Sequence, residues 1–299
     1  MRLQVLETWP LTFDDGTPVR AASAVAPFGD GWLVVQDDAT HAAWVRPGSV
    51  TPVRVVGAVD GLEVFSSAAG TKHLKPDFEA ACPVPVAGGA GVLLLGSGST
   101  AARMRAALLT PGETVVAELS PLYARVAAAL GLDLDRLNLE GACVAGDRLR
   151  WFQRGNSAAG VPTASVDVEL AAVLRAMSGS TEPINPSAVR RYDLGFVRGV
   201  ALAVTDAVAL PDGRVLVSAA AEDTPNAVDD GPVVGAALAL LDDEAVVAVA
   251  ELPAVDGVAP KVEGLAVREV GPDGVRLLAV VDADDPLVPS QAVEITLRW

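Results

Sequence analysis

Histidine, cysteine and aromatic residues are scarce in this chain of 299 residues, which has 2 histidines, 2 cysteines and 4% aromatics. A serine–histidine–aspartate triad would need His41 or His73 as its base, and the sequence has no Gly-x-Ser-x-Gly elbow to present the serine. An exposed loop histidine is the simpler interpretation of both. We interpret Cys82 and Cys143 as small hydrophobic fillers, with a redox or metal pair as the alternative.

Positive charge is also in short supply. The chain carries 38 acidic against 22 basic residues, a formal net charge of −16. Such a charge repels phosphate backbones and anionic membranes at long range, which argues against nucleic-acid and membrane partners. No run approaches the roughly 18 apolar residues of a membrane span, and the first residues lack the basic region and apolar core of a secretory signal. We therefore expect a cytoplasmic protein.

What the sequence does contain is a five-fold internal repeat. A short segment that begins with a polar residue and continues with small residues recurs along the chain. The leading polar residues of successive segments are 56 to 66 residues apart. The step from the last of them through the two termini to the first is 59. A repeat that uses the whole chain in this way predicts a closed ring of like modules. The leading residues are Ser23, Glu79, Glu140, Asp206 and Glu263.

Each repeat has the pattern of four short strands. A leading apolar stretch is followed by a turn, such as Pro211-Asp212-Gly213, and by further apolar runs. Four antiparallel strands make a propeller blade, so we predict an all-β protein, a five-bladed β-propeller that forms a single domain from residue 1 to residue 299. The last repeat ends after its third run, and Leu3–Leu11 has the pattern of the missing strand. We expect this N-terminal strand to complete the last blade and close the ring.

Small residues follow the leading residue in every repeat. Because neighbouring residues of a strand point to opposite faces, we expect these small residues to pack between blades near the axis, where space is least. The leading residues would then point into an axial channel. The small residues are Ala24, Ala80, Gly141, Ala207 and Gly264, and two positions further on Ala26, Cys82, Cys143, Ala209 and Ala266.

Four of the leading residues are acidic, and carboxylates that share a narrow channel need to be neutralised. One solution is a divalent cation, because Ca²⁺ and Mg²⁺ prefer carboxylate oxygens. A second is a set of internal cations, since Lys75, Arg136 and Lys261 lie within four residues of a leading glutamate. A third is protonation of one or two of the carboxyls. The sequence leaves these three open.

A glycine-rich segment offers a second candidate site. Gly96-Ser97-Gly98-Ser99-Thr100 precedes Arg103 and Arg105, and backbone amides, hydroxyls and guanidinium groups together can cradle a phosphate or carboxylate. It is not a P-loop, because the Gly-Lys-Ser/Thr ending is absent. The simpler interpretation is the loop that joins the second and third strands of a blade.

The repeat resembles the phytase-like (esterase-like phytase) propellers and related bacterial propeller proteins. The likeness rests on starts such as Leu139-Glu140-Gly141-Ala142 and Val262-Glu263-Gly264-Leu265, together with Lys75-Pro76-Asp77-Phe78-Glu79 and Gly96-Ser97-Gly98-Ser99-Thr100. The repeat is also similar to the gluconolactonase and regucalcin group, where a Glu-Gly-Pro start supplies an axial metal ligand. Both resemblances imply a propeller, and the second implies a metal ion in its channel.

From these observations we expect a small-molecule hydrolase of ester, lactone or phosphoester type, with Ca²⁺ or Mg²⁺ polarising a small anionic or ester-like substrate and activating water. The alternative is a non-catalytic propeller that binds a ligand or a protein on one rim, its channel charges being structural. In the hydrolase, the expected metal ligands are Glu79, Glu140, Asp206 and Glu263, the catalytic residues Glu79, Glu140, Lys75 and Arg136, and the substrate-binding residues Arg154, Ser97, Lys261 and His73.

Overall fold

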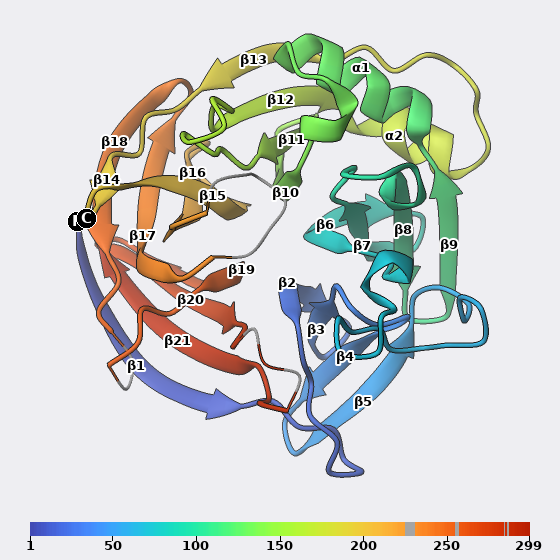
Figure 1. Cartoon of the computed structure of the whole chain (residues 1–299), viewed down its shortest axis with the longest axis horizontal. Helices are drawn as coiled ribbons and strands as arrows, with labels where there is room; N and C mark the ends of the chain where they lie inside the picture. The colour runs from blue at the N-terminus through green and yellow to red at the C-terminus, as the bar shows by residue number, and fades with distance from the viewer. Residues whose placement is uncertain (225–230, 255–256, 284, 286) are drawn as a thin grey trace.

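The computed structural model describes residues 1–224, 231–254, 257–283, 285 and 287–299, which form five antiparallel sheets around one axis (Figure 1). In each sheet the strands follow one another in chain order from the axis outward, except that the N-terminal strand is outermost in the last sheet and a short extra strand pairs with the inner strand of the fourth. The predicted five-bladed β-propeller is therefore confirmed. None of the helices among the described residues is both long and apolar enough to cross a membrane.

The blades follow one another along the chain. Blade one consists of β2 (Ala22–Phe28), β3 (Gly31–Gln36), β4 (His41–Arg46) and β5 (Ser49–Arg54). Blade two consists of β6 (Phe78–Val86), β7 (Gly89–Gly96), β8 (Arg105–Thr110) and β9 (Glu113–Glu118). Blade three consists of β10 (Leu139–Ala145), β11 (Arg148–Gln153), β12 (Ala164–Glu169) and β13 (Ser187–Arg191). Blade four consists of β15 (Val200–Ala209), β16 (Val215–Glu222), β17 (Val233–Asp242) and β18 (Ala245–Glu251), with the short β14 (Phe196–Val197) beside β15. Blade five consists of β19 (Val262–Gly271), β20 (Gly274–Val281), β21 (Gln291–Arg298) and β1 (Arg2–Pro10).

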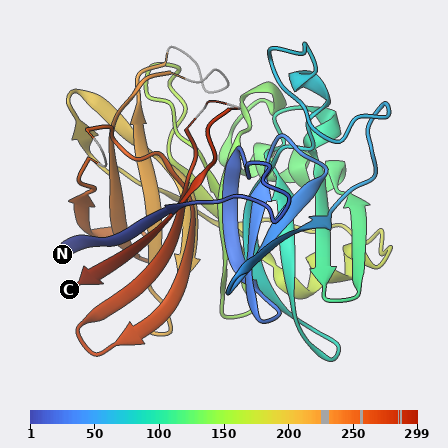
Figure 2. The ribbon, with the colours of Figure 1, turned by 90° about the horizontal axis from the view of Figure 1, so that it is seen from below.

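The N-terminal strand closes the ring, as the repeat predicted. β1 pairs antiparallel with β21, from Arg2 opposite Arg298 to Pro10 opposite Gln291, and so becomes the outermost strand of blade five. Figure 2 shows the two termini side by side at one edge of the molecule. Because the first and last segments of the chain share one sheet, the ring cannot open without breaking that pairing.

Apolar side chains between neighbouring sheets hold the blades together. Among the described residues there is one buried cluster at each of the five junctions. Between blades one and two, for example, Leu33 and Val35 pack with Leu94 and Leu109, all of them essentially inaccessible to solvent. Removing such side chains from water is the main favourable contribution to the stability of the fold.

Two α-helices were not predicted. They are α1 (Ser120–Leu130) and α2 (Leu170–Met177), which cover the outer part of the junction between blades two and three (Figure 1). α1 ends at Gly131, whose φ of 73° is the left-handed cap that glycine adopts without cost. Tyr123 of α1 packs edge-on against Trp151, with ring centroids 4.8 Å apart, and its hydroxyl donates to Gly96 O at 2.8 Å. The described residues also form the short 3-10 helices η1 (Lys72–Leu74), η2 (Ala101–Arg103) and η3 (Leu134–Arg136).

Small residues do line the junctions near the axis. A Cβ atom added to Gly141 would lie 2.7 Å from Asp206 Cα in the next blade, and one added to Gly264 would lie 2.7 Å from the carbonyl carbon of Ala24. Real side chains do not approach a backbone that closely, so the inner strands of neighbouring blades are in contact at these points. The predicted packing of small residues between blades is confirmed here.

Candidate functional site

In blades one, two, three and five, the polar residue that leads the repeat lies on a β-bulge near the start of the inner strand. In blade two, for example, the register shifts between Phe78 and Ala80. A bulge takes one residue out of the alternation of the strand and redirects its side chain. The bulge residues that line the cavity at this end of the axis are Ser23, Glu79, Glu140 and Glu263.

Blade four differs from the prediction by one residue. Its bulge residue is Thr205, so Thr205 and not Asp206 is the counterpart of the other leading residues. The hydroxyl contacts agree with this assignment: Ser23 Oγ donates to Phe78 O at 2.6 Å, and Thr205 Oγ1 donates to Val262 O at 2.5 Å. In both cases the acceptor is the residue just before the leading glutamate of the next blade.

Asp206 consequently lies at the junction between blades four and five, the position that Ala24 and Gly264 occupy in other blades. Its Oδ2 accepts a hydrogen bond from Leu265 N at 2.6 Å, and its Oδ1 has no hydrogen-bond partner among the described residues. The side chain is fully buried and is not among the described residues that line the cavity on the axis. The expectation that Asp206 points into the channel is corrected accordingly.

A cavity of about 670 Å³ lies at the mouth of the axis. Its lining comes from blades one, two, three and five and from the segment 65–75 that connects blades one and two. We call it the axial cavity. The predicted site residues that line it are Lys75, Glu79, Glu140, Arg154, Lys261, Glu263 and His73.

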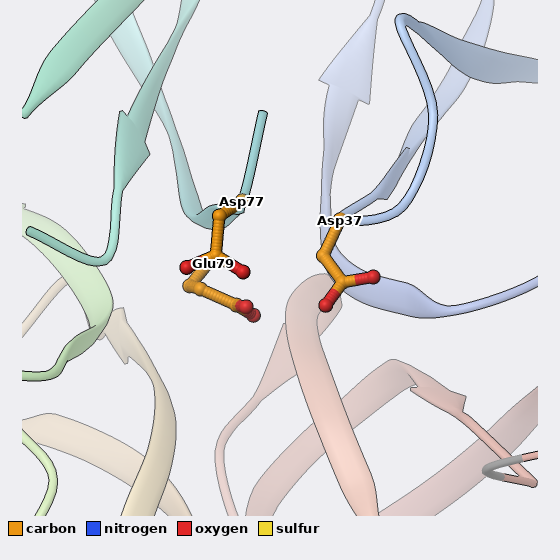
Figure 3. Close-up of side chains that lie close together, drawn as sticks. All are labelled: Asp37, Asp77 and Glu79. Carbon is orange, nitrogen blue, oxygen red and sulfur yellow. The ribbon is translucent and has the colours of Figure 1, made fainter. Parts of the chain in front are cut away.

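Lys75 is the centre of one charged cluster in this cavity. Its Nζ lies 2.5 Å from Asp77 Oδ1 and 3.8 Å from Glu79 Oε1, and it also contacts the carboxylate of Asp37. Figure 3 shows Asp77 and Glu79 of blade two turned toward Asp37, which follows β3 of blade one. Although burial lowers the pKa of Lys75, these carboxylates raise it well above its usual value. The lysine is thus a fixed cation between the two blades.

The same three carboxylates are the described residues best placed to hold a metal ion, because one oxygen from each lies within 4.8 Å of the others. Lys75, however, already contacts all three of them. A divalent cation bound here would have to displace the ammonium group. The residues therefore fit an internal cation as they stand and a metal only after Lys75 has moved.

A second set of charges runs across blades three to five as an alternating chain. Arg154 Nη1 donates to Glu140 Oε1 at 2.9 Å, and its other terminal nitrogen contacts Glu222. Lys261 Nζ lies 3.8 Å from Glu222 Oε1 and 3.1 Å from Glu263 Oε1. Glu140 and Glu263 thus each have a cation of the protein beside them, and the chain of ion pairs links three blades at the axis.

Glu140 is the carboxyl group most suited to proton transfer. Its Oε1 accepts hydrogen bonds from Asn138 Nδ2 and Arg154 Nη1, both at 2.9 Å, while its buried Oε2 has no hydrogen-bond partner among the described residues. Burial raises the pKa of Glu140 to about 7; Arg154 opposes this rise, and Glu263 adds to it. Burial and the neighbouring Asp37 and Asp77 likewise raise the pKa of Glu79.

Stability should depend on pH through Glu140. Its pKa is raised from an ordinary 4.5 to about 7, so between these values the folded protein binds more protons than the unfolded chain and stability falls as pH rises. The contribution of this group should drop by about 3 kcal/mol over that window and be constant above it. Urea unfolding of the wild type and Glu140→Gln at pH 4.5 to 8 measures this, and the variant should show the shallower fall. The control Glu113→Gln, at an exposed residue that begins β9, should follow the wild type.

The remaining predicted site residues are placed differently. Ser97 is buried outside the lining of the axial cavity, and its hydroxyl donates to Asp77. His73 is an exposed residue of η1 at the cavity rim. Arg136 does not pair with Glu140; instead it donates a hydrogen bond to Ala159 O and lines a different cavity. The cation that pairs with Glu140 is Arg154.

Sequence reasoning missed Asp37, Asp77, Asn138 and Glu222 as site residues. A signal was available, because Asp37, Ser97 and Arg154 each directly follow the second strand of a blade. The end of that strand lies beside the start of the antiparallel inner strand, so polar residues at the two places meet. The amide of Arg154, for instance, donates to Asn138 O at 2.9 Å.

Comparison with known proteins gives a family but no activity. A family model described as "Family of unknown function (DUF6910)" matches residues 71–286. No curated protein matches the sequence.

Solved structures resemble the chain only distantly. A mannose phosphorylase from Leishmania mexicana is 15% identical, with a TM-score of 0.48, covering 99% of this chain and 89% of its own. An endo-arabinanase from Bacillus licheniformis is 11% identical, with a TM-score of 0.43 and 97% of both chains covered. A luciferin-regenerating enzyme is 10% identical, with a TM-score of 0.42, covering 93% of this chain and 78% of its own. Likeness at this level carries no inference about activity.

Proposed function

This chain belongs to DUF6910, a family of unknown function, and on that premise we propose from the site itself that it is a hydrolase of small ester, lactone or phosphoester molecules acting in the axial cavity. The observation that carries the proposal is Glu140. One oxygen of its carboxyl group is fixed by Asn138 and Arg154, the other has no hydrogen-bond partner among the described residues, and its pKa is about 7.

A carboxyl group with a pKa near neutrality can both accept and donate a proton at working pH. In the proposed reaction, ionised Glu140 takes a proton from the attacking water and returns it to the leaving oxygen. Lys75, Arg154 and Lys261 line the same cavity and stabilise the negative charge that develops on the substrate. The resemblance of the repeat to phytase-like propellers supports the inclusion of phosphoesters.

The proposal does not require a metal ion. A divalent cation at Asp37, Asp77 and Glu79 would polarise the substrate only after displacing Lys75, which contacts all three carboxylates. Calcium or magnesium is therefore the second form of the proposal, and it predicts that the cation stabilises the protein, because a ligand that binds only the folded state raises its melting temperature.

Hydrolysis should be lost in Glu140→Gln, because glutamine has the shape of glutamate but cannot carry the proton. We expect kcat/KM to fall by about 100-fold or more on whichever of 4-nitrophenyl acetate, γ-butyrolactone or 4-nitrophenyl phosphate is turned over. In the wild type, kcat/KM should rise with pH and level off above about pH 7, since Glu140 must be ionised to act as the base. Initial rates with EDTA, and with excess calcium or magnesium, are the measurement.

Glu113→Gln is the matched control and should keep wild-type rates. Activity that survives Glu140→Gln would remove Glu140 from the mechanism, and activity or a melting temperature that depends on a cation would favour the metal form. If none of the three substrates is turned over under any condition, the hydrolase proposal is wrong for these classes. The alternative, a non-catalytic propeller with structural axial charges, would then be favoured by the pairing of those charges with Lys75, Arg154 and Lys261.

A further inference from the structure

A second cavity, of about 750 Å³, lies between blades three and four. Its walls come from residues 154–163, residues 191–203 and residues 222–224, together with the end of α1 and Arg136 of η3. We call it the side cavity. Among the described residues it shares only Arg154 with the axial cavity, so it is a separate site from the one that holds Glu140.

An addition to the propeller builds one wall of this cavity. Four strands complete a blade, but blade four also has β14, which pairs with the start of β15 through Phe196 opposite Ala201. The hairpin places Phe196 on the cavity wall, where 65% of this residue is exposed. An aromatic ring presented to solvent in a concave wall offers its face to a planar ligand.

Two arginines of the side cavity lack a carboxylate partner. Arg136 and Arg191 both line it, and neither has an acidic group of the described residues within 4.0 Å, unlike Arg154, which pairs with two glutamates. Arg136 is held in place by its hydrogen bond to Ala159 O. In a protein with a net charge of −16, two guanidinium groups without an ion pair in one cavity indicate an anionic ligand.

The lining also holds three acidic residues, Asp193, Glu222 and Asp223, and the structure shows no ion pair between any of them and Arg136 or Arg191. Glu222 pairs with Arg154 and Lys261. Asp193 accepts a hydrogen bond from Gly195 N at 3.0 Å and so faces the backbone of its own hairpin. Asp223 is exposed, and the structure shows no ion pair between it and either arginine. Both guanidinium groups therefore keep donors for a ligand, and Phe196 supplies the apolar surface beside them.

We propose that the side cavity binds a phosphomonoester that carries a planar ring, with the ring on Phe196 and the phosphate at Arg136 and Arg191. A phosphate has three acceptor oxygens and a charge near −2, which suits two guanidinium groups better than a carboxylate does. The site lies outside the axial cavity, so it does not depend on the hydrolytic proposal.

Isothermal titration calorimetry with phenylphosphonate, which resists hydrolysis, tests the proposal. Phenylphosphonate should bind more tightly than inorganic phosphate or benzoate. Arg136→Gln and Arg191→Gln should each weaken its binding by about tenfold or more, because each removes a charge-assisted hydrogen bond. Phe196→Leu should weaken phenylphosphonate binding but leave inorganic phosphate unchanged, which separates the contribution of the ring from that of the charge.

Two controls accompany these variants. Arg125→Gln removes an equal charge from the outside of α1, where Arg125 contacts Asn185, and should bind as the wild type does. Glu113→Gln changes an exposed residue at the start of β9, which lines neither cavity, and should likewise leave binding unchanged. If Arg136→Gln disturbs folding, Arg136→Lys keeps the charge and loses the planar fork, and it should still weaken binding.

The proposal would be overturned by the absence of saturable binding of phenylphosphonate. It would also be overturned if Arg136→Gln and Arg191→Gln bound it as tightly as Arg125→Gln does. Benzoate binding more tightly than phenylphosphonate would show that the phosphate class is wrong. None of these results would bear on the hydrolytic activity proposed for Glu140, so the two proposals are tested independently.

Discussion

Deletion of Met1–Leu11 should lower the free energy of unfolding by roughly 5 kcal/mol or more. β1 forms eight residue pairs with β21, and each main-chain hydrogen bond contributes on the order of 1 kcal/mol. Leu3 and Val5 also pack against the buried cluster between blades four and five, and Leu11 is itself buried. A loss of this size is comparable to the whole stability of many domains. Chemical denaturation followed by tryptophan fluorescence measures it.

The deletion also leaves β21 as an exposed edge strand, which invites association with other chains. We therefore expect aggregates on size-exclusion chromatography. A synthetic peptide of residues 1–11 added in trans should restore part of the lost stability, because it can pair with β21 again. A truncated protein that unfolds at the same denaturant concentration as the full chain would show that β1 does not close the ring.

Gly141→Leu should destabilise the protein by about 3 kcal/mol or more. Gly141 has a φ of 67°, which costs other residues about 1 kcal/mol, and overpacking a tight site typically costs about 1 to 3 kcal/mol more. Any Cβ there would lie 2.7 Å from the backbone of Asp206 in the next blade, which has no room to move without shifting the inner strand. Thermal and urea unfolding of the purified variant give the size of the loss.

The matched control is Gly112→Leu. Gly112 lies in the turn between β8 and β9, and a Cβ there would meet nothing within 4 Å. This variant should keep nearly the stability of the wild type. Equal stability of the two variants would contradict the close contact between the inner strands of blades three and four.

The sequence by itself determined the number of blades and the closure of the ring. Both depend on a period and on patterns local to each repeat, such as the turn at Pro211-Asp212-Gly213 and the strand-like segment at the N-terminus. Glu79, Glu140 and Glu263 were placed correctly at the axis for the same reason, because each occupies the same position in its repeat. Apolar spacing at Leu122, Val126 and Leu130 could also have predicted α1.

Only the tertiary structure decided which charges meet. A bulge moves one residue out of the alternation of side chains along a strand. That Thr205 and not Asp206 occupies the bulge in blade four depends on strand pairing that the sequence does not display. Arg154 rather than Arg136 neutralises Glu140, because antiparallel pairing brings the end of β11 beside the start of β10. The side cavity combines residues that are distant in the chain, Arg136, Arg191 and Phe196. Local patterns specify elements, whereas long-range pairing between them specifies the sites.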